Sequence, residues 1–279
     1  MAKGGKYAGL SHTLADISAA LDRLAAEHSS STASPHARKL IDNGLVAVTK
    51  RIDTLRRAYD PIDQPKAVFD AANPSTIGRF IALALVAQPR VPLSYLKSFY
   101  GSGVYAFYYK GPFTPYKPIS GTETPIYVGQ ADPASRDAAT PIDQGDRLTG
   151  RVLYHRRNLE KATTTLSVND FDCRTLVVRS GAETQAEDYL IALFKPVWNK
   201  EMRILQGFGK HGDASVTRQH PQSPWDVLHP ARKWAAGSPP NLKSEAEIKN
   251  DVQQHFAATK IFKTNAKVMA AFMDKLKQL

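Results

Sequence analysis

The sequence is poor in cysteine and has no long apolar run. Cys173 is the only cysteine among 279 residues, which excludes an intrachain disulfide and a metal site built from several thiolates. Its place in a strand-like stretch indicates an ordinary buried residue. The longest apolar runs, such as residues 80–87, are much shorter than the roughly 18 residues that cross a bilayer. A signal-peptide pattern is also missing, because an amphipathic stretch follows the first residues. We therefore expect a cytoplasmic protein with no membrane partner.

Basic residues outnumber acidic residues. The chain has 37 Lys and Arg against 26 Asp and Glu, a net charge of +11 at neutral pH. This excess favours a polyanionic partner such as nucleic acid, although an anionic membrane surface would attract the same charge. With 42% hydrophobic residues, the chain can bury a core, either as one large domain or as a small domain with sizeable extensions.

Helical periodicity marks both ends of the chain. In the first sixty residues, apolar positions repeat in steps of three and four on each side of the turn-rich residues 29–35, which predicts a helical hairpin. The apolar stripes could pack on the main domain or on a second subunit, and we favour the first because most amphipathic helices serve their own core. Further helices are predicted over residues 77–87, closed by Pro89 and Pro92, and in a tail over residues 244–279.

The middle of the chain alternates strand and helix patterns. Residues 104–109 and 126–128 are strand-like and flank a Gly- and Pro-rich loop, and residues 171–178 form a third candidate strand. Residues 147–161 and 184–194 have helical character, and the second of these must end near Pro196.

This order predicts an α+β fold with a small, mixed or antiparallel, three-stranded sheet flanked by helices. We expect a helical N-terminal extension over residues 1–98 and a core over residues 99–200. A basic loop region and helical C-terminal tail over residues 201–279 would bind nucleic acid or form a dimer.

Two tripeptides stand out because of the residues that follow them. Gly103-Val104-Tyr105 and Tyr127-Val128-Gly129 lie on successive predicted strands. Either one alone is weak evidence, since strand tyrosines are usually sheet or core aromatics. Arg151 and His155 follow at positions i and i+4, so their side chains share one face of a helix. The later candidates are Glu187 and Asn199.

This arrangement resembles the GIY-YIG nuclease superfamily, in which one strand carries Gly-Ile-Tyr and the next Tyr-Ile-Gly. Here each Ile is replaced by Val, which is also β-branched. In the superfamily an arginine on the following helix and a glutamate on a later helix complete the site, matching Arg151 and Glu187. Its restriction enzymes also have a histidine 4 residues after that arginine and an asparagine 12 residues after the glutamate, matching His155 and Asn199. The closest resemblance, which includes residues 223–230, is to the type II restriction endonucleases of this fold that recognise CCGCGG.

The resemblance implies hydrolysis of a DNA phosphodiester by water with Mg²⁺ as cofactor, for which Mn²⁺ would substitute. Glu187 would be the single carboxylate ligand of the cation, with water and phosphate oxygen completing the shell. Tyr105, hydrogen-bonded to His155 or Tyr127, would help to deprotonate the water, and the division of that task between Tyr105 and His155 stays open. Arg151 would stabilise the added charge on the phosphate.

The resemblance also implies the partners. An enzyme that reads a palindrome in double-stranded DNA is expected to be a symmetric homodimer, and its host would need a cognate DNA methyltransferase, although not in a stable complex. Arginines that read guanine edges would suit a site of G·C pairs. Each basic candidate could instead contact only a phosphate, or no DNA at all. The candidates for DNA binding are Arg147, Arg156, Arg203, Lys210, Arg218 and Arg232.

The residues by themselves leave simpler interpretations open. Arg151 could belong to a solvated basic helix face, and His155 could be a surface histidine or a second phosphate ligand. Glu187 fits a capping box with Thr184, in which its carboxylate would bind a backbone N–H. Asn199 could be a turn residue or assist the site, as the resemblance implies. Two other functions also remain: another GIY-YIG DNA nuclease of the homing or repair type, and a non-catalytic protein that binds nucleic acid.

Overall fold

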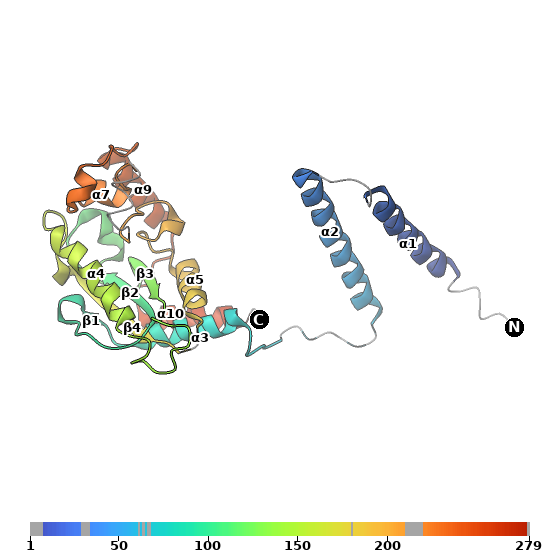
Figure 1. The fold of residues 1–279 in the computed structure, drawn as a ribbon, viewed down its shortest axis with the longest axis horizontal. Helices are drawn as coiled ribbons and strands as arrows, with labels where there is room; N and C mark the ends of the chain where they lie inside the picture. The colour runs from blue at the N-terminus through green and yellow to red at the C-terminus, as the bar shows by residue number, and fades with distance from the viewer. Residues whose placement is uncertain are drawn as a thin grey trace. The chain divides into compact units, whose positions relative to one another are not determined.

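The computed structural model describes residues 8–28, 34–60, 62, 65, 68–179, 181–209 and 220–277. The chain divides into two compact units, Met1–Lys66 and Ala67–Leu279, and both are drawn in Figure 1. Within the described ranges, no helix is both long enough and apolar enough to cross a membrane.

The first unit contains the two N-terminal helices that the sequence predicts, and their packing as a hairpin stays a prediction. It consists of α1 (Ala8–His28) and α2 (Pro35–Tyr59). The start of α2 is well specified, because the Ser34 side chain accepts a hydrogen bond from the amide of Ala37 and a proline occupies the first helical position. No described residue of α2 is buried, and Leu14 and Leu40 are 59% and 68% exposed. The apolar stripes are therefore uncovered within this unit.

The second unit is built on an antiparallel sheet. Its strands are β1 (Val91–Pro92), β2 (Gly103–Tyr109), β3 (Tyr127–Ala131) and β4 (Phe171–Val177), in the order β1-β4-β2-β3. The three predicted strands are present, and β1 adds a fourth by pairing with β4 at the sheet edge. Two residues, one of them proline, are too few to give a strand pattern in the sequence.

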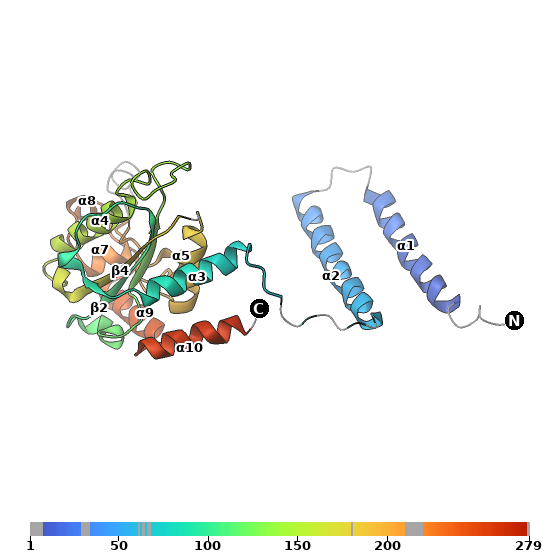
Figure 2. The same ribbon diagram turned by 90° about the horizontal axis from the view of Figure 1, so that it is seen from below.

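Helices cover both faces of this sheet. Tyr105, Phe107 and Tyr109 of β2 face a core that includes residues of α4 (Arg147–Lys161), α7 (Pro224–Leu228) and α9 (Glu245–Ala258). The alternate residues of β2 face a second core, and Figure 2 shows its helices grouped together. These helices are α3 (Pro74–Ala87), α5 (Glu183–Phe194) and α10 (Asn265–Leu276). Because both faces are covered, every residue of β2 is buried.

The C-terminal tail is two helices, α9 and α10, rather than one continuous helix. A capping box of Ser244 and Glu247 starts α9, and the Thr264 side chain caps α10. Between them Phe262 is 1% exposed, and its amide donates to Oγ1 of Thr124 at 2.7 Å. This link lets α9 pack in one core and α10 in the other.

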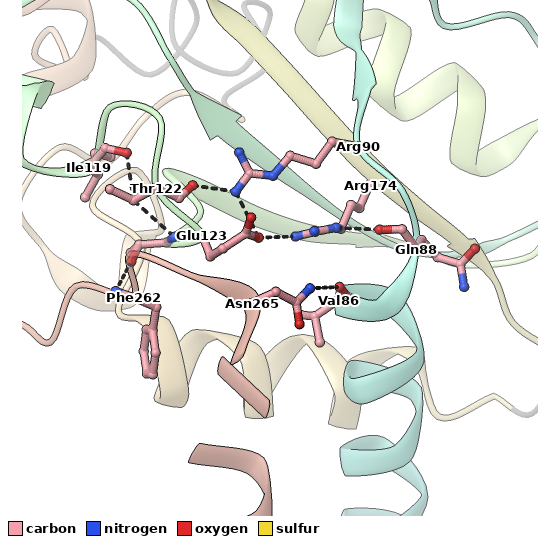
Figure 3. Close-up of polar contacts among 10 residues, drawn as sticks. Val86, Gln88, Arg90, Ile119, Thr122, Glu123, Arg174, Phe262 and Asn265 are labelled. Atoms are coloured by element: carbon pink, nitrogen blue, oxygen red, sulfur yellow. Dashed lines mark hydrogen bonds and ion pairs between the residues drawn. The ribbon is translucent and has the colours of Figure 1, made fainter. Parts of the chain in front are cut away.

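A buried charge cluster joins the second core to its surrounding loops (Figure 3). The carboxylate of Glu123 binds Nη2 of Arg90 at 2.9 Å and Nη1 of Arg174 at 2.8 Å. Both guanidinium groups also lie over the ring of Tyr108, at 4.0 and 4.8 Å from its centroid. Although burial opposes ionisation, the two arginines hold the pKa of Glu123 below its ordinary value. The amide of Glu123 donates to the carbonyl of Phe262 at 2.7 Å, so the cluster is tied to the C-terminal tail.

We expect Glu123→Gln to lower the free energy of unfolding by about 2–3 kcal/mol at neutral pH, because the buried guanidinium of Arg174 and the half-buried guanidinium of Arg90 lose their counter-charge. The depressed pKa of Glu123 means that this stabilisation is present above the ordinary carboxyl pKa and disappears as pH falls through the folded-state pKa. Urea denaturation at neutral and acidic pH measures it, with the exposed Glu160→Gln as control. A difference that did not shrink on acidification would contradict this assignment.

Candidate active site

The pairing of β2 with β3 places two tyrosines on one face. Tyr105 pairs with Gly129 and Phe107 with Tyr127, and the ring centroids of Tyr105 and Tyr127 lie 6.1 Å apart. A Cβ at position 129 would overlap the ring and hydroxyl of Tyr105. Gly103, at φ 149°, likewise approaches the carbonyl of Leu176 too closely for any side chain. Close packing therefore explains why each tripeptide contains a glycine.

His155 is buried among aromatic rings rather than exposed on the surface. It is 0% exposed, and its ring stacks on Phe208 with centroids 4.5 Å apart and planes 19° apart. The ring of Tyr127 meets it edge-on at 5.2 Å, and the ring of Tyr105 lies at 5.9 Å. His155 thus packs against both tyrosines, and the alternative interpretation of a surface histidine is wrong.

A cleft of about 430 Å³ gathers most of the predicted site residues. It lies at the sheet edge formed by β3, which α4 and α5 approach from opposite faces of the sheet. Of the six predicted site residues, the cleft is lined by Tyr105, Tyr127, Arg151, Glu187 and Asn199. His155 does not line it. The cleft also contains two charged side chains that the sequence analysis missed, Lys200 and Glu201.

The two tyrosines are held in their protonated forms by burial. Burial raises the pKa of Tyr105 well above 10, the neighbouring Tyr127 raises it further, and Arg151 opposes both effects. Burial likewise raises the pKa of Tyr127, against the effect of Arg151. Ionisation of either phenol therefore needs positive charge to enter the cleft.

Glu187 is a helix residue with no part in capping. The helix α5 begins at Glu183 after Ala182, without a side-chain cap, so the predicted capping box of Thr184 and Glu187 is wrong. Burial raises the pKa of Glu187 to about 7, and the charges of Glu201 and Asp188 add to the effect. A half-buried carboxylate whose ionisation is opposed by the charges of two other carboxylates is stabilised by a bound cation, so Glu187 is a suitable cation ligand.

Asn199 pairs with the backbone of the edge strand. Its side chain is 4% exposed, its Oδ1 accepts from the amide of Val128 at 3.0 Å, and its Nδ2 donates to the carbonyl of Val128 at 2.9 Å. Val128 lies between Tyr127 and Gly129 in β3. Both polar groups of Asn199 are used in this way, so its role is to position β3 and the segment that follows residue 199.

Arg232 corrects a sequence prediction. It was expected to bind DNA, but it is 4% exposed, and its Nε donates to Oδ1 of Asp226 at 2.7 Å. Its Nη2 donates to the carbonyl of Gly207 at 3.0 Å, and its guanidinium carbon lies 4.8 and 4.7 Å from the rings of Trp225 and Trp234. A guanidinium with these partners is not available to DNA. It holds the backbone of Gly207, which lines the cleft.

The segment 223–230 supports the cleft through packing and hydrogen bonds. Trp225 packs against Phe208 with ring centroids 5.3 Å apart. Nδ1 of His229 is hydrogen-bonded to Oγ1 of Thr165 at 2.8 Å, and its Nε2 to the hydroxyl of Tyr116. Burial lowers the pKa of His229 to about 3, which keeps it neutral. This segment therefore acts through packing.

The other basic candidates have different surroundings. Arg147 and Arg151 line a second, open cleft of about 510 Å³ that shares Gln130 with the first. Arg156 pairs with Glu160 on its own helix at 3.2 Å. Arg203 is exposed and has a left-handed backbone, with φ 57°. The remaining two candidates, Lys210 and Arg218, lie outside the described residues.

The carboxylates suit a hard divalent cation. Across the described residues, no group of three or more His, Cys, Asp or Glu side chains is arranged to hold a metal ion. Glu187 and Glu201 line the same cleft and offer oxygen donors, which Mg²⁺ and Mn²⁺ bind through one or two carboxylates with water in the other positions. A positive charge would also oppose the neighbouring carboxylates that raise the pKa of Glu187.

In EDTA we expect Glu187→Gln to melt at a higher temperature than wild type at alkaline pH. The pKa of Glu187, raised to about 7 from the ordinary 4.5, makes ionisation destabilise the fold. That penalty is absent below the ordinary pKa, grows as pH rises from about 4.5 to about 7, and stays at about 3 kcal/mol above that. Melting curves from about pH 5 to pH 8 measure it, with Glu160→Gln as control. A difference in melting temperature between Glu187→Gln and wild type that stayed constant with pH would refute the raised pKa of Glu187.

The sequence comparisons agree with this geometry. Residues 97–256 match the family model of the Eco29kI GIY-YIG domain, a match that spans more than half of the chain and includes the whole cleft. No curated protein matches the chain. The matched range also contains the supporting segment 223–230. The chain therefore belongs to the GIY-YIG restriction-enzyme family represented by Eco29kI.

Proposed function

We propose that this protein is a type II restriction endonuclease that hydrolyses DNA phosphodiester bonds with Mg²⁺, for which Mn²⁺ substitutes. The observation that carries the proposal is the single cleft lined by Tyr105, Tyr127, Arg151 and Glu187. It combines a permanent cation, a cation-binding carboxylate and two phenols within a nuclease family domain. Such a set can bind, orient and activate a phosphodiester and a water molecule.

Arg151 binds the scissile phosphate in this proposal. Its planar guanidinium is always charged and offers several donors to the phosphate oxygens, whose negative charge grows in the transition state. Glu187 holds the divalent cation, which supplies a second positive charge beside the phosphate when it is bound. Arg151 and Glu187 reach the cleft from α4 and α5, which pack on opposite faces of the sheet.

In this proposal Tyr105 first loses its own phenolic proton to water in the cleft, and the resulting phenolate takes the proton of the attacking water. Tyr105 and His155 are both 0% exposed, but the Tyr105 side chain lines the cleft and the His155 side chain does not. Burial makes the phenolate costly, and Arg151 lowers this cost. Tyr127 orients the same water, and His155 fixes the ring of Tyr127 by packing against it.

We further propose a short palindromic, G+C-rich target, CCGCGG by the resemblance, cut in double-stranded DNA by a homodimer. A two-fold protein matches a two-fold site, and the apolar stripes of α1 and α2, which are uncovered within their own unit, are a candidate surface for a second subunit. Arg147, Arg156 and Arg203 remain candidates for DNA contacts, together with Lys210 and Arg218. A cognate methyltransferase would protect the host DNA without forming a stable complex.

Incubating the protein with plasmid DNA and Mg²⁺, then sequencing the ends, tests the proposal. We expect a limited set of fragments whose ends map to one short palindrome, and no cutting in EDTA. Glu187→Gln should cut at less than about a tenth of the wild-type rate, because losing a charge–metal contact costs several kcal/mol. Cutting at branched or scattered sites would favour a homing or repair nuclease, and absence of cutting would favour a DNA-binding protein.

Arg151→Ala should lose cleavage far more than DNA affinity. Removing one transition-state contact commonly lowers the rate by about 10²–10³-fold, while a chain of net charge +11 keeps its other phosphate contacts. Single-turnover cleavage and DNA binding in Ca²⁺ measure the two quantities. The control is Arg157→Ala, an exposed arginine on the same helix. Equal losses of rate and affinity would argue against this role.

A further inference from the structure

We propose that Glu201 is a second acidic determinant of divalent-cation binding, acting together with Glu187 across the catalytic cleft. The inference rests on the cation site of the proposed function and adds a residue to it. Glu187 lies on α5, whereas Glu201 lies on the short 3-10 turn η4 (Lys200–Met202). Both side chains line the same cleft of about 430 Å³, so two separate chain segments bring a carboxylate to one site.

The segment that carries Glu201 is held in place by the backbone of the edge strand. Asn199, two residues earlier, makes both hydrogen bonds to Val128. The turn closes with the amide of Met202 donating to the carbonyl of Asn199 at 3.2 Å and with Arg203 in a left-handed conformation. The position of Glu201 is therefore fixed by the sheet, although its side chain is 39% exposed.

The charge of Glu201 is only weakly compensated within the protein. Its ion pair with Nζ of Lys200 is long, at 3.8 Å, and the Lys200 side chain is 87% exposed, so water screens this pair strongly. Glu201 meanwhile acts on the cleft. After burial, its charge is the next largest cause of the raised pKa of Glu187, and it also raises the pKa of Tyr127.

Two carboxylates that repel each other in an empty cleft attract a cation jointly. A single carboxylate binds Mg²⁺ or Mn²⁺ weakly, and affinity rises with the number of charged oxygen donors around the ion. The second charge also acts over several ångströms in the reduced dielectric of a cleft, so Glu201 contributes either as a ligand or through a bridging water.

Titration of the full-length protein with Mn²⁺ by calorimetry, near pH 8 and without DNA, tests this role. Glu201→Gln should weaken Mn²⁺ binding about tenfold, whereas Lys200→Met, which removes a positive charge from the same cleft, should strengthen it. Glu245 is the first residue of α9, is paired with Lys249 at 2.6 Å and does not line the cleft. Glu245→Gln should therefore leave the affinity for Mn²⁺ unchanged. Thermal melting in EDTA checks that each variant is folded. The melting temperature of Glu201→Gln should be no lower than that of wild type, because the repulsion between Glu201 and Glu187 is removed.

The outcomes separate this inference from the proposed function. A weakening of less than threefold by Glu201→Gln, with binding abolished by Glu187→Gln, would overturn the inference and leave the proposed function intact. Unchanged Mn²⁺ binding in Glu187→Gln would overturn the cation site itself, and the role of Glu201 with it.

Discussion

The pairing of β2 with β3 is the constraint on which the site depends. Its register puts Tyr105 opposite Gly129, and the tyrosine ring lies where a side chain at position 129 would be. Because β3 is an edge strand, the outward amide and carbonyl of Val128 need partners from outside the sheet. Asn199 supplies both. One side-chain amide therefore completes the sheet edge and fixes the chain segment that carries the next two cleft residues.

The wall of the cleft depends on a second set of buried polar contacts. Gly207 has φ 120°, and a Cβ there would collide with the side chain of Ser223. Arg232 binds the carbonyl of Gly207 and the carboxylate of Asp226, while Phe208 stacks on His155. Since His155 in turn packs against Tyr127, the residues after position 199 help to orient a tyrosine of the sheet. This explains why a chain segment with loop-like composition belongs to the folded core.

Local sequence patterns predict single helices and strands. The predictions fail where contacts between residues that are distant in the sequence determine the structure. Local residue composition predicts α4 with its observed bounds and the strands β2 and β4 to within one residue. The same reasoning missed β1, because pairing with β4 rather than propensity makes it a strand. Arg232 looks like any other basic residue in sequence, and only the contact with Asp226 shows that it is internal. Lys200 and Glu201 carry no motif, and their adjacency to Asn199 was the one available signal.

Under the proposed function, the charges of the cleft suit two ligands rather than one. Arg151 and Lys200 line the same cleft as Glu187 and Glu201, and burial together with the charges of Glu201 and Asp188 raises the pKa of Glu187 against the effect of the two cations. A phosphate alone would bind the two basic side chains but add repulsion to the carboxylates. A divalent cation alone would satisfy the carboxylates but add repulsion to Arg151. Phosphate and cation together satisfy both sets, and each strengthens the binding of the other by linkage. In the proposed mechanism, the bound cation would supply the positive charge that favours ionisation of the buried phenol of Tyr105.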